Sequence, residues 1–256
     1  LDTMRPSILP NLLTAAAQNA HRGYGDVALF EVGPAYANAT PKGQSTVAAG
    51  IRVGRTGHKD WAGSARPVDA FDAKADALAV IEAVEGPAGN AQVSTDAASW
   101  YHPGRSGCLR LGPNVMAMFG EVHPAILEKL DLRGPAVAFE VILDKVPMPK
   151  AKATQKPMLQ LSPFQPVTRD FAFVVDDAIA AEQITRAAAG GDKKLVTNVT
   201  VFDVFQGGAL GDGKKSIAIQ VTLQPTDKTL TDEDLEAVAK KIVGNVEKQT
   251  GGVLRG

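Results

Sequence analysis

Alternation of apolar and polar residues in the last third of the chain restricts its fold more than any other feature. Three short stretches alternate in this way, at residues 169–176, 199–205 and 216–223, and each is typical of a half-buried strand. A helix is predicted at 180–189. A longer one begins at Thr231, where Asp234 completes a capping box. A short strand at 252–255 completes the order β-α-β-β-α-β.

This order is the ferredoxin-like motif, in which both helices cover one face of the sheet. Each strand should then have a core side and a free side. The residues expected on the core side are Phe171, Phe173, Val175, Phe202, Val204, Ile217, Ile219, Val221 and Leu223. Those expected on the free side are Asp170, Ala172, Val174, Val201, Asp203, Phe205, Ala218, Gln220 and Thr222. The free face is thus mostly small and polar, with Phe205 as its one aromatic residue.

The first 145 residues have a different pattern. Helices are predicted at 10–21 and 73–84, and strands at 26–32, 46–53, 107–111, 115–122 and 137–143. Gly-Pro pairs, such as Gly33-Pro34 and Gly134-Pro135, are expected to separate these elements. The order is not a regular βαβ alternation, so it predicts an α+β fold with a largely antiparallel sheet.

Between the two patterns lies a stretch rich in proline and lysine, residues 146–163. Such a composition favours an extended, solvated linker. We therefore expect a first domain at 1–145, a linker at 146–163 and a second domain at 164–256. The chain begins at Leu1 without an initiator methionine, and we interpret it as a fragment of a longer polypeptide.

Charge and cysteine content exclude some broad classes. The net charge is −1, with 16 Lys and Arg against 15 Asp and Glu in residues 1–163 and 11 against 13 in residues 164–256. Any contact with nucleic acid must therefore use a local patch. The single cysteine, Cys108, excludes an internal disulfide framework and fits a reducing cytoplasm. No apolar run reaches the roughly 18–20 residues that span a membrane, so no membrane partner is expected.

Few residues carry an enzyme-like pattern. The histidines His21, His58, His102 and His123 have no metal-ligand spacing, and structural roles are expected for them. Cys108 lies in an apolar strand, which indicates a buried, inert thiol. The glycines at 207–213 favour a hairpin turn over a phosphate-binding loop. Residues 100–105, Trp-Tyr-His-Pro-Gly-Arg, favour a packed turn that enters the strand at Gly107, with a ligand site as the alternative.

Short motifs in both halves resemble the phenylalanyl-tRNA synthetase β subunit. In the first half these are Met-Arg-Pro-Ser-Ile-Leu-Pro-Asn-Leu-Leu at 4–13, Leu-Phe-Glu-Val-Gly at 29–33, Tyr-His-Pro-Gly-Arg at 101–105 and Phe-Gly-Glu-Val-His-Pro at 119–124. In the second half they are Pro-Val-Thr-Arg-Asp at 166–170, Phe-Asp-Val-Phe-Gln-Gly at 202–207, Lys-Lys-Ser-Ile-Ala at 214–218 and Lys-Thr-Leu-Thr-Asp-Glu at 228–233. They occur in the family's order over nearly the whole chain.

The resemblance implies a degenerate class II synthetase-like domain followed by an anticodon-binding domain. The family is an α2β2 ligase that charges tRNA with phenylalanine, using ATP and Mg²⁺, and catalysis belongs to its α subunit. This chain is then expected to pack against α, to bind tRNA and to hold no cofactor of its own. Ala37 stands where a working class II site has the arginine that binds the ATP α-phosphate, and a methyl group cannot replace a guanidinium there.

The resemblance also implies which residues contact RNA. The matching family strand usually reads Phe-Asp-x-Tyr-Gln-Gly, and its Asp and Tyr contact an anticodon base together with a small residue on the first strand. These positions are Asp203, Phe205 and Ala172 here, with Phe205 in place of tyrosine. Weaker candidates for phosphate contacts are Arg169, Lys214 and Lys215. The alternatives are an autonomous RNA-binding module and an independent class II-like ligase of small molecules.

Overall fold

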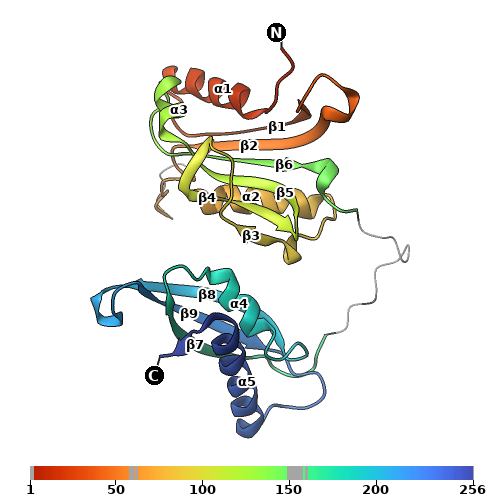
Figure 1. Cartoon of the computed structure of the whole chain (residues 1–256), viewed down its shortest axis with the longest axis vertical. Coiled ribbons are helices and arrows are strands. Elements are labelled where there is room, and N and C mark those ends of the chain that lie inside the picture. Colours follow the sequence, from red (N-terminus) through yellow and green to blue (C-terminus); the bar gives the residue numbers. More distant parts are fainter. Residues whose placement is uncertain (1–2, 58–60, 62, 149–157, 159–160, 256) are drawn as a thin grey trace. The chain divides into compact units, whose positions relative to one another are not determined.

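The chain folds into two compact units, Leu1–Thr154 and Gln155–Gly256. Figure 1 shows the computed structural model, which describes residues 3–57, 61, 63–148, 158 and 161–255. The two units divide within the stretch expected to be a linker, and most of that stretch lies outside the described residues. At its described ends, Val146 is buried in the first unit, and the Ser162 hydroxyl donates to the Pro225 carbonyl in the second, at 2.6 Å.

The first unit is built on a six-stranded antiparallel sheet in the order β1-β2-β6-β5-β4-β3. Its strands are β1 Val27–Tyr36, β2 Gln44–Val53, β3 Gln92–Ser94, β4 Tyr101–Leu111, β5 Asn114–Val122 and β6 Ala136–Ile142. Its α-helices are α1 Leu9–His21, α2 Ala70–Ala83 and α3 Pro124–Lys129. Short 3-10 turns lie at Pro41–Gly43, Ala88–Asn90 and Leu143–Lys145. The expected α+β class with an antiparallel sheet is confirmed.

Helices cover both faces of this sheet. The residues of β6 alternate between two hydrophobic clusters, with Ala136 and Ala138 in the α1 cluster and Val137, Phe139 and Val141 in the α2 cluster. Since successive strand residues point to opposite faces, α1 and α2 lie on opposite sides of the sheet (Figure 1). Helix α2 packs on β5 and β6 and reaches only part of β2, so the same face of the edge strand β1 stays exposed.

Several predicted boundaries in this unit are wrong. Strand β1 continues through Gly33-Pro34 to Tyr36, although the pair was expected to end it. Proline is tolerated there because β1 is an edge strand and its outward N–H groups need no partner. Strand β4 begins at Tyr101, so residues 101–105 form its first part and do not form a turn before it. Helix α2 begins at Ala70, since Asp69 caps it.

The second unit has the predicted ferredoxin-like order. Its elements are β7 Val167–Asp176, α4 Ala181–Ala189, β8 Val196–Gln206, β9 Lys214–Leu223, α5 Asp232–Thr250 and β10 Val253–Leu254, with a 3-10 turn at Gly208–Leu210. The sheet order is β10-β7-β9-β8, and every pairing is antiparallel. The buried cluster formed by its described residues joins α4 and α5 to one side of β7 and β9. Both helices therefore cover the same face (Figure 1).

The predicted capping box of α5 is confirmed. The Thr231 hydroxyl accepts from the Asp234 backbone N–H at 3.2 Å, and the Asp234 carboxylate accepts from the Thr231 N–H at 3.1 Å. The helix ends at Gly251, whose φ of 68° is the left-handed conformation that favours glycine. No helix of the described residues is long and apolar enough to cross a membrane.

Candidate nucleic-acid interface

Among the described residues, both helices of the second unit pack on one face of its sheet; we call the opposite face the open face. It is made by strands β7, β9 and β8, with β9 in the middle. The pairing aligns its residues in four rows across the strands. From the end nearest the Gly208–Leu210 turn, these rows are Val174–Ser216–Phe205, Ala172–Ala218–Asp203, Asp170–Gln220–Thr200 and Thr168–Thr222–Asn198. Successive rows on one face lie about 6.8 Å apart, because each strand residue rises about 3.4 Å.

A bulge in β8 decides which residues reach this face. Val201 pairs with Ile219 and Asp203 pairs with Ala218, so Phe202 between them is the extra residue. Val201 packs against the buried core, whereas the Phe202 side chain is 57% exposed. The prediction placed these two residues the other way round and is wrong, because it assumed unbroken alternation along the strand.

Beyond the bulge the predicted sides hold again. Val204 pairs with the buried Ile217, which is the core side, but Val204 itself is 53% exposed. Asp203 and Phe205 lie on the open face as predicted, opposite Ala218 and Ser216.

The Phe205 ring forms the apolar end of the open face. It is 44% exposed, and it rests on Gly207, where an added Cβ would come within 2.9 Å of the ring. Its cross-strand partner Ser216 is 5% exposed, and Val174 lies on the other side of Ser216. The ring therefore packs against Gly207, and its exposed part remains available for stacking.

The row next to this ring has small side chains at two of its three positions. Ala172 and Ala218 carry only methyl groups, and Asp203 ends the row with an exposed carboxylate. Since neighbouring strands are about 4.8 Å apart, Ala172 and Asp203 are separated by roughly 10 Å across Ala218. A flat ring placed on Phe205 could therefore extend over the alanines and present its edge to Asp203.

The predicted phosphate contacts are divided between the two sides of the sheet. Lys214 shares the open side, but its ammonium forms an ion pair with Asp176 at 2.6 Å. Lys215 starts from the other side and donates to the Asp177 carbonyl at 2.7 Å. Arg169 also starts from the core side, opposite Val221, and is exposed. Of the three, only Lys214 starts on the same side as Asp203 and Phe205.

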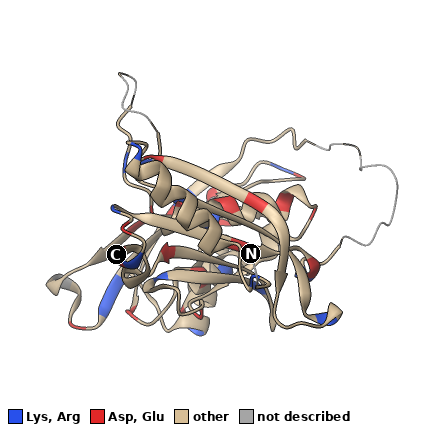
Figure 2. Cartoon of the chain, turned by 90° about the horizontal axis from the view of Figure 1, so that it is seen from above, with Lys and Arg blue, Asp and Glu red and all other residues tan. Residues whose placement is uncertain are grey.

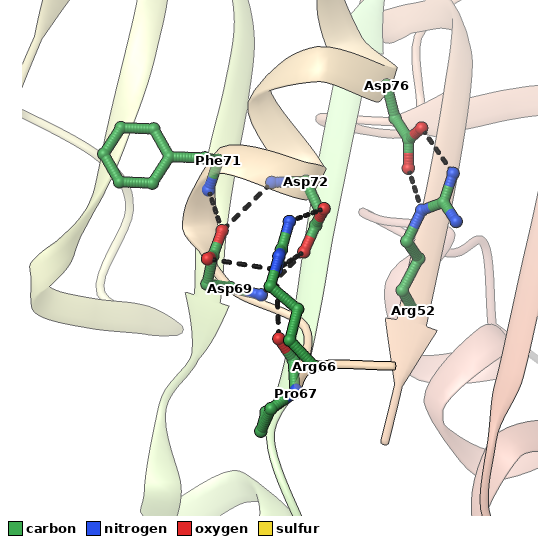
Figure 3. A network of polar contacts seen from close by, with 7 residues as sticks. All are labelled: Arg52, Arg66, Pro67, Asp69, Phe71, Asp72 and Asp76. Atoms are coloured by element: carbon green, nitrogen blue, oxygen red, sulfur yellow. Dashed lines mark hydrogen bonds and ion pairs between the residues drawn. The ribbon is translucent and has the colours of Figure 1, made fainter. Parts of the chain in front are cut away.

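In the first unit the charged side chains stabilise the fold. Arg66 binds Asp69 at 3.1 Å and Asp72 at 2.7 Å at the start of α2 (Figure 3). The hydrogen bond from Arg66 holds the pKa of Asp72 below its usual value. Because this guanidinium is occupied by two carboxylates, it resembles a helix cap and not a phosphate-binding group. Ala37 follows β1 directly, and its N–H donates to the Gly43 carbonyl at 2.8 Å in the hairpin.

An apolar groove runs between β1 and α2. It has a volume of roughly 350 Å³ and is lined mainly by Ala28, Phe30, Ala79, Val80, Ala83 and Phe139. Phe30 is 80% exposed, which is unusual for a phenylalanine in a strand. An ion pair between Arg52 and Asp76, at 2.6 Å, borders the groove (Figure 3), and the hydrogen bond that Arg52 donates to the Asp76 carboxylate raises the pKa of Arg52. The sequence prediction did not identify this groove.

The described residues hold no cluster of His, Cys, Asp and Glu that could bind a metal. His21 contacts Asp131 at 3.2 Å, His102 accepts from Gly104, and His123 caps α3; His58 lies outside the described residues. Cys108 is buried as predicted, and burial raises the pKa of its thiol. Figure 2 shows both signs of charge scattered along the elements, in agreement with the near-neutral composition.

Comparison with known proteins agrees with this architecture. Residues 1–143 match the family described as phenylalanyl tRNA synthetase beta chain CLM domain, and residues 162–255 match the ferredoxin-fold anticodon binding domain. Phenylalanine–tRNA ligase β subunits from Rhodospirillum rubrum and Paramagnetospirillum magneticum are 56% and 55% identical over 100% of this chain. The chain spans 32% of the length of each.

A solved pyrrolysyl-tRNA synthetase from Desulfitobacterium hafniense is 19% identical, with a TM-score of 0.39, over 55% of this chain and 48% of that one. The two family matches together extend over both units, in the order that the sequence motifs predict. The resemblance seen in those motifs is confirmed: the chain belongs to the phenylalanyl-tRNA synthetase β-chain family.

Proposed function

We propose that this chain is the part of a phenylalanine–tRNA ligase β subunit that binds the anticodon region of tRNA and packs against the catalytic α subunit. The tRNA contact is made by the open face of the second sheet, through Phe205, Asp203 and Ala172. The assembly is an α2β2 heterotetramer in the cytoplasm. The chain supplies binding surfaces, while the chemistry of aminoacylation takes place on α.

One observation carries the RNA-binding part of this proposal. Phe205, Asp203 and Ala172 come from two different strands, and they lie in two adjacent rows on the open face, opposite the described helices of the second unit. Proteins bind unpaired bases by stacking them on aromatic rings and by hydrogen bonds to their edges. The Phe205 ring offers a stacking surface, and the Asp203 carboxylate, at the end of the neighbouring row with the two alanines, offers a hydrogen-bond acceptor.

The side chains indicate what kind of base would fit. A carboxylate only accepts hydrogen bonds, so Asp203 favours a base edge that carries N–H donors, such as the amino group of guanine. Phenylalanine at 205 retains the stacking surface of the usual tyrosine but has no hydroxyl. Of the predicted phosphate contacts, Lys214 is the one that starts on this side of the sheet.

The α contact is assigned to the first unit. Ala37 replaces the arginine that a working class II site requires, so this unit has no evident chemistry of its own. The groove between β1 and α2, with the exposed Phe30 beside it, offers an apolar docking surface. Obligate interfaces are core-like and typically bury about 2,000 Å² or more. ATP and Mg²⁺ are used by the whole enzyme and are assigned to α, with no cofactor site on this chain.

Co-purification with α, followed by an aminoacylation assay, tests both parts. Full-length β carrying Phe30→Asp should retain less α than wild type, because a carboxylate would be buried at the contact. Tyr24→Ser, a change at another exposed aromatic residue of the same unit, serves as the control and should retain α normally.

The RNA part is tested in the same assembled enzyme. Asp203→Ala combined with Phe205→Ala should lower kcat/KM for tRNA at physiological salt while pyrophosphate exchange with phenylalanine is unchanged. Unaltered charging by this double variant would contradict the open-face assignment. Phenylalanine-dependent pyrophosphate exchange by the isolated chain without α would contradict the assignment of chemistry to α.

A further inference from the structure

The second unit has a pocket that the proposed tRNA contact does not use. It lies beside α5, which packs on the face of the sheet opposite the open face. Three segments meet there: the turn that precedes β8, the loop that joins β9 to α5, and the first turns of α5 itself. The volume of the pocket is roughly 310 Å³, which is at the lower end of the range for small-molecule sites.

Charged contacts fix two sides of this pocket to α5. In the turn before β8, the Asp192 carboxylate accepts from two backbone N–H groups of the same turn, at 3.1 and 3.3 Å. It also accepts from the Lys241 ammonium of α5, at 3.2 Å. In the loop, the Lys228 ammonium donates to the Asp234 carboxylate of α5, at 2.8 Å. Because each contact joins a connecting segment to the helix, the fold itself forms the pocket.

Apolar side chains line part of the pocket. They belong to Leu195, Pro225, Leu230, Ala237 and Val238. Val238 is 3% exposed, and Leu195 and Leu230 pack against the buried cluster of the unit. These side chains form no hydrogen bonds with water, so an apolar group that enters the pocket is stabilised by leaving water.

The charged groups of the pocket retain some binding capacity. Lys228 and Lys241 each form an ion pair with one carboxylate, although an ammonium has three hydrogen-bond donors. Asp227 also lines the pocket, and among the described residues it has no hydrogen bond or ion pair. The pocket therefore offers spare donors on two lysines, one free carboxylate and an apolar surface.

We propose that this pocket binds a free α-amino acid with an apolar side chain. The carboxylate of the amino acid accepts from Lys228 and Lys241, its ammonium donates to Asp227, and its side chain lies against the apolar residues. The site is separate from the tRNA contact, because none of its lining residues belongs to the rows of the open face.

Other small ligands would use only part of this pocket. A hydrocarbon would leave the spare lysine donors and the Asp227 carboxylate without partners. A phosphate would leave the apolar surface in contact with water, and it would face the three carboxylates of Asp192, Asp227 and Asp234. A peptide segment from within a chain has neither the free ammonium nor the free carboxylate. An apolar amino acid is the class whose groups match all three features.

An NMR titration of the isotopically labelled 256-residue chain with L-leucine tests this assignment. The backbone amide signals of residues 226–230 should shift in a saturable way. Two relatives of leucine separate its charges, since 4-methylpentanoate lacks the ammonium and 3-methylbutylamine lacks the carboxylate. Each should bind the wild-type chain about two- to fivefold more weakly than leucine, which is the range for one exposed ion pair.

Three variants locate the contacts. Asp227→Asn should weaken leucine binding about two- to fivefold but leave 4-methylpentanoate binding unchanged, because that ligand has no ammonium. Ala237→Phe should abolish binding of both, since Ala237 is exposed and the added ring would fill the pocket without breaking an ion pair. Asp212→Asn is the matched control, because Asp212 is an exposed aspartate that does not line the pocket. It should bind leucine as wild type does.

The outcomes decide the assignment. Leucine binding that is tighter than that of both relatives, with a loss in Asp227→Asn and none in Asp212→Asn, supports it. No saturable shifts in wild type, or equal binding of leucine and 4-methylpentanoate, overturns it. Undiminished binding in Ala237→Phe, or equal losses in Asp227→Asn and Asp212→Asn, would place the effect outside the pocket and also overturn it. None of these results bears on the tRNA contact, which is tested at Phe205.

Discussion

The two sheets of this protein are both antiparallel, but they differ in how many of their faces are covered. In the first unit α1 and α2 lie on opposite faces, and each face contributes to its own buried cluster. In the second unit α4 and α5 share one face, and the other carries mostly small and polar residues, with Phe205 and Val174 at one end. A face that is covered by helices is restricted by packing, whereas side chains on the other face can vary more freely. Among the described residues, only the second sheet has a face on which no helix of its own unit packs.

The largest expected effect tests whether the two faces of the second sheet really differ. Ile219 and Ala218 are neighbours on β9, with Ile219 fully buried and Ala218 on the open face. Ile219→Ala should destabilise the second unit by about 2–5 kcal/mol, because it leaves a cavity. Ala218→Ser should change stability by no more than about 0.5 kcal/mol.

Amide hydrogen exchange of the β9 backbone measures both variants. Fluorescence would not serve here, because both tryptophans and all three tyrosines lie in the first unit. Equal losses of protection in the two variants would mean that the open face is also packed against something. This result would contradict the difference between the two faces of the sheet.

A smaller effect is expected on the stability of the second unit when the pH is lowered. Hydrogen bonds from Lys228 and from Thr231 lower the pKa of Asp234 to about 2. Because the folded state lowers this pKa, the stabilisation is present above the ordinary pKa of aspartate, near about 4, and is lost as the pH falls through about 2. Asp234→Asn should therefore weaken protection of α5 at neutral pH and match wild type in strong acid. A constant difference at every pH would contradict the contribution of this charge.

The smallest expected effect is in the first unit, where the dependence of stability on pH should have the opposite sign. Burial raises the pKa of Glu140, whose carboxylate accepts from the Ser7 hydroxyl at 2.6 Å. Since the folded state raises this pKa, the stabilisation is complete below the ordinary glutamate range and is lost as the pH rises through the folded value. Glu140→Gln should thus become more stable than wild type as the pH rises to neutral, when unfolding is followed by tryptophan fluorescence. A variant less stable than wild type at neutral pH would show that the carboxylate is needed in its ionised form.

Much of the second unit could be predicted from its sequence, because strands and helices there follow simple periodicities. The element order, the capping box at Thr231 and the core positions of β7 and β9 are confirmed. The sides of Val201 and Phe202 could not be predicted, since a bulge adds one residue and leaves no signal in the pattern. Gly207 could have indicated where the Phe205 ring lies, and the prediction did not use it. The ring lies so close to Gly207 that a side chain at this position would displace it.

The first unit was harder to predict for physical reasons. Its interior strands are buried on both faces, so their residues form nearly continuous apolar runs without alternation. The short strand β3 and helix α3 were missed, and β1 was ended too early at Gly33-Pro34 because proline is a breaker except on an edge strand. The apolar groove beside Phe30 depends on how far α2 reaches across the sheet, which a local pattern does not contain.

Two phenylalanines of β8, one in the bulge and one beyond it, provide the most direct test of the central claim. Phe205 lies on the open face and Phe202 is the bulged residue, and both rings are exposed, at 44% and 57%. The measurement is the Kd of tRNA for the assembled enzyme carrying Phe205→Ala or Phe202→Ala, at physiological salt. We expect Phe205→Ala to weaken binding by about 1–3 kcal/mol, as for the loss of one stacked base, and Phe202→Ala to leave it near wild type. Equal effects of the two changes, or a larger effect of Phe202→Ala, would contradict the open face as the anticodon-binding surface.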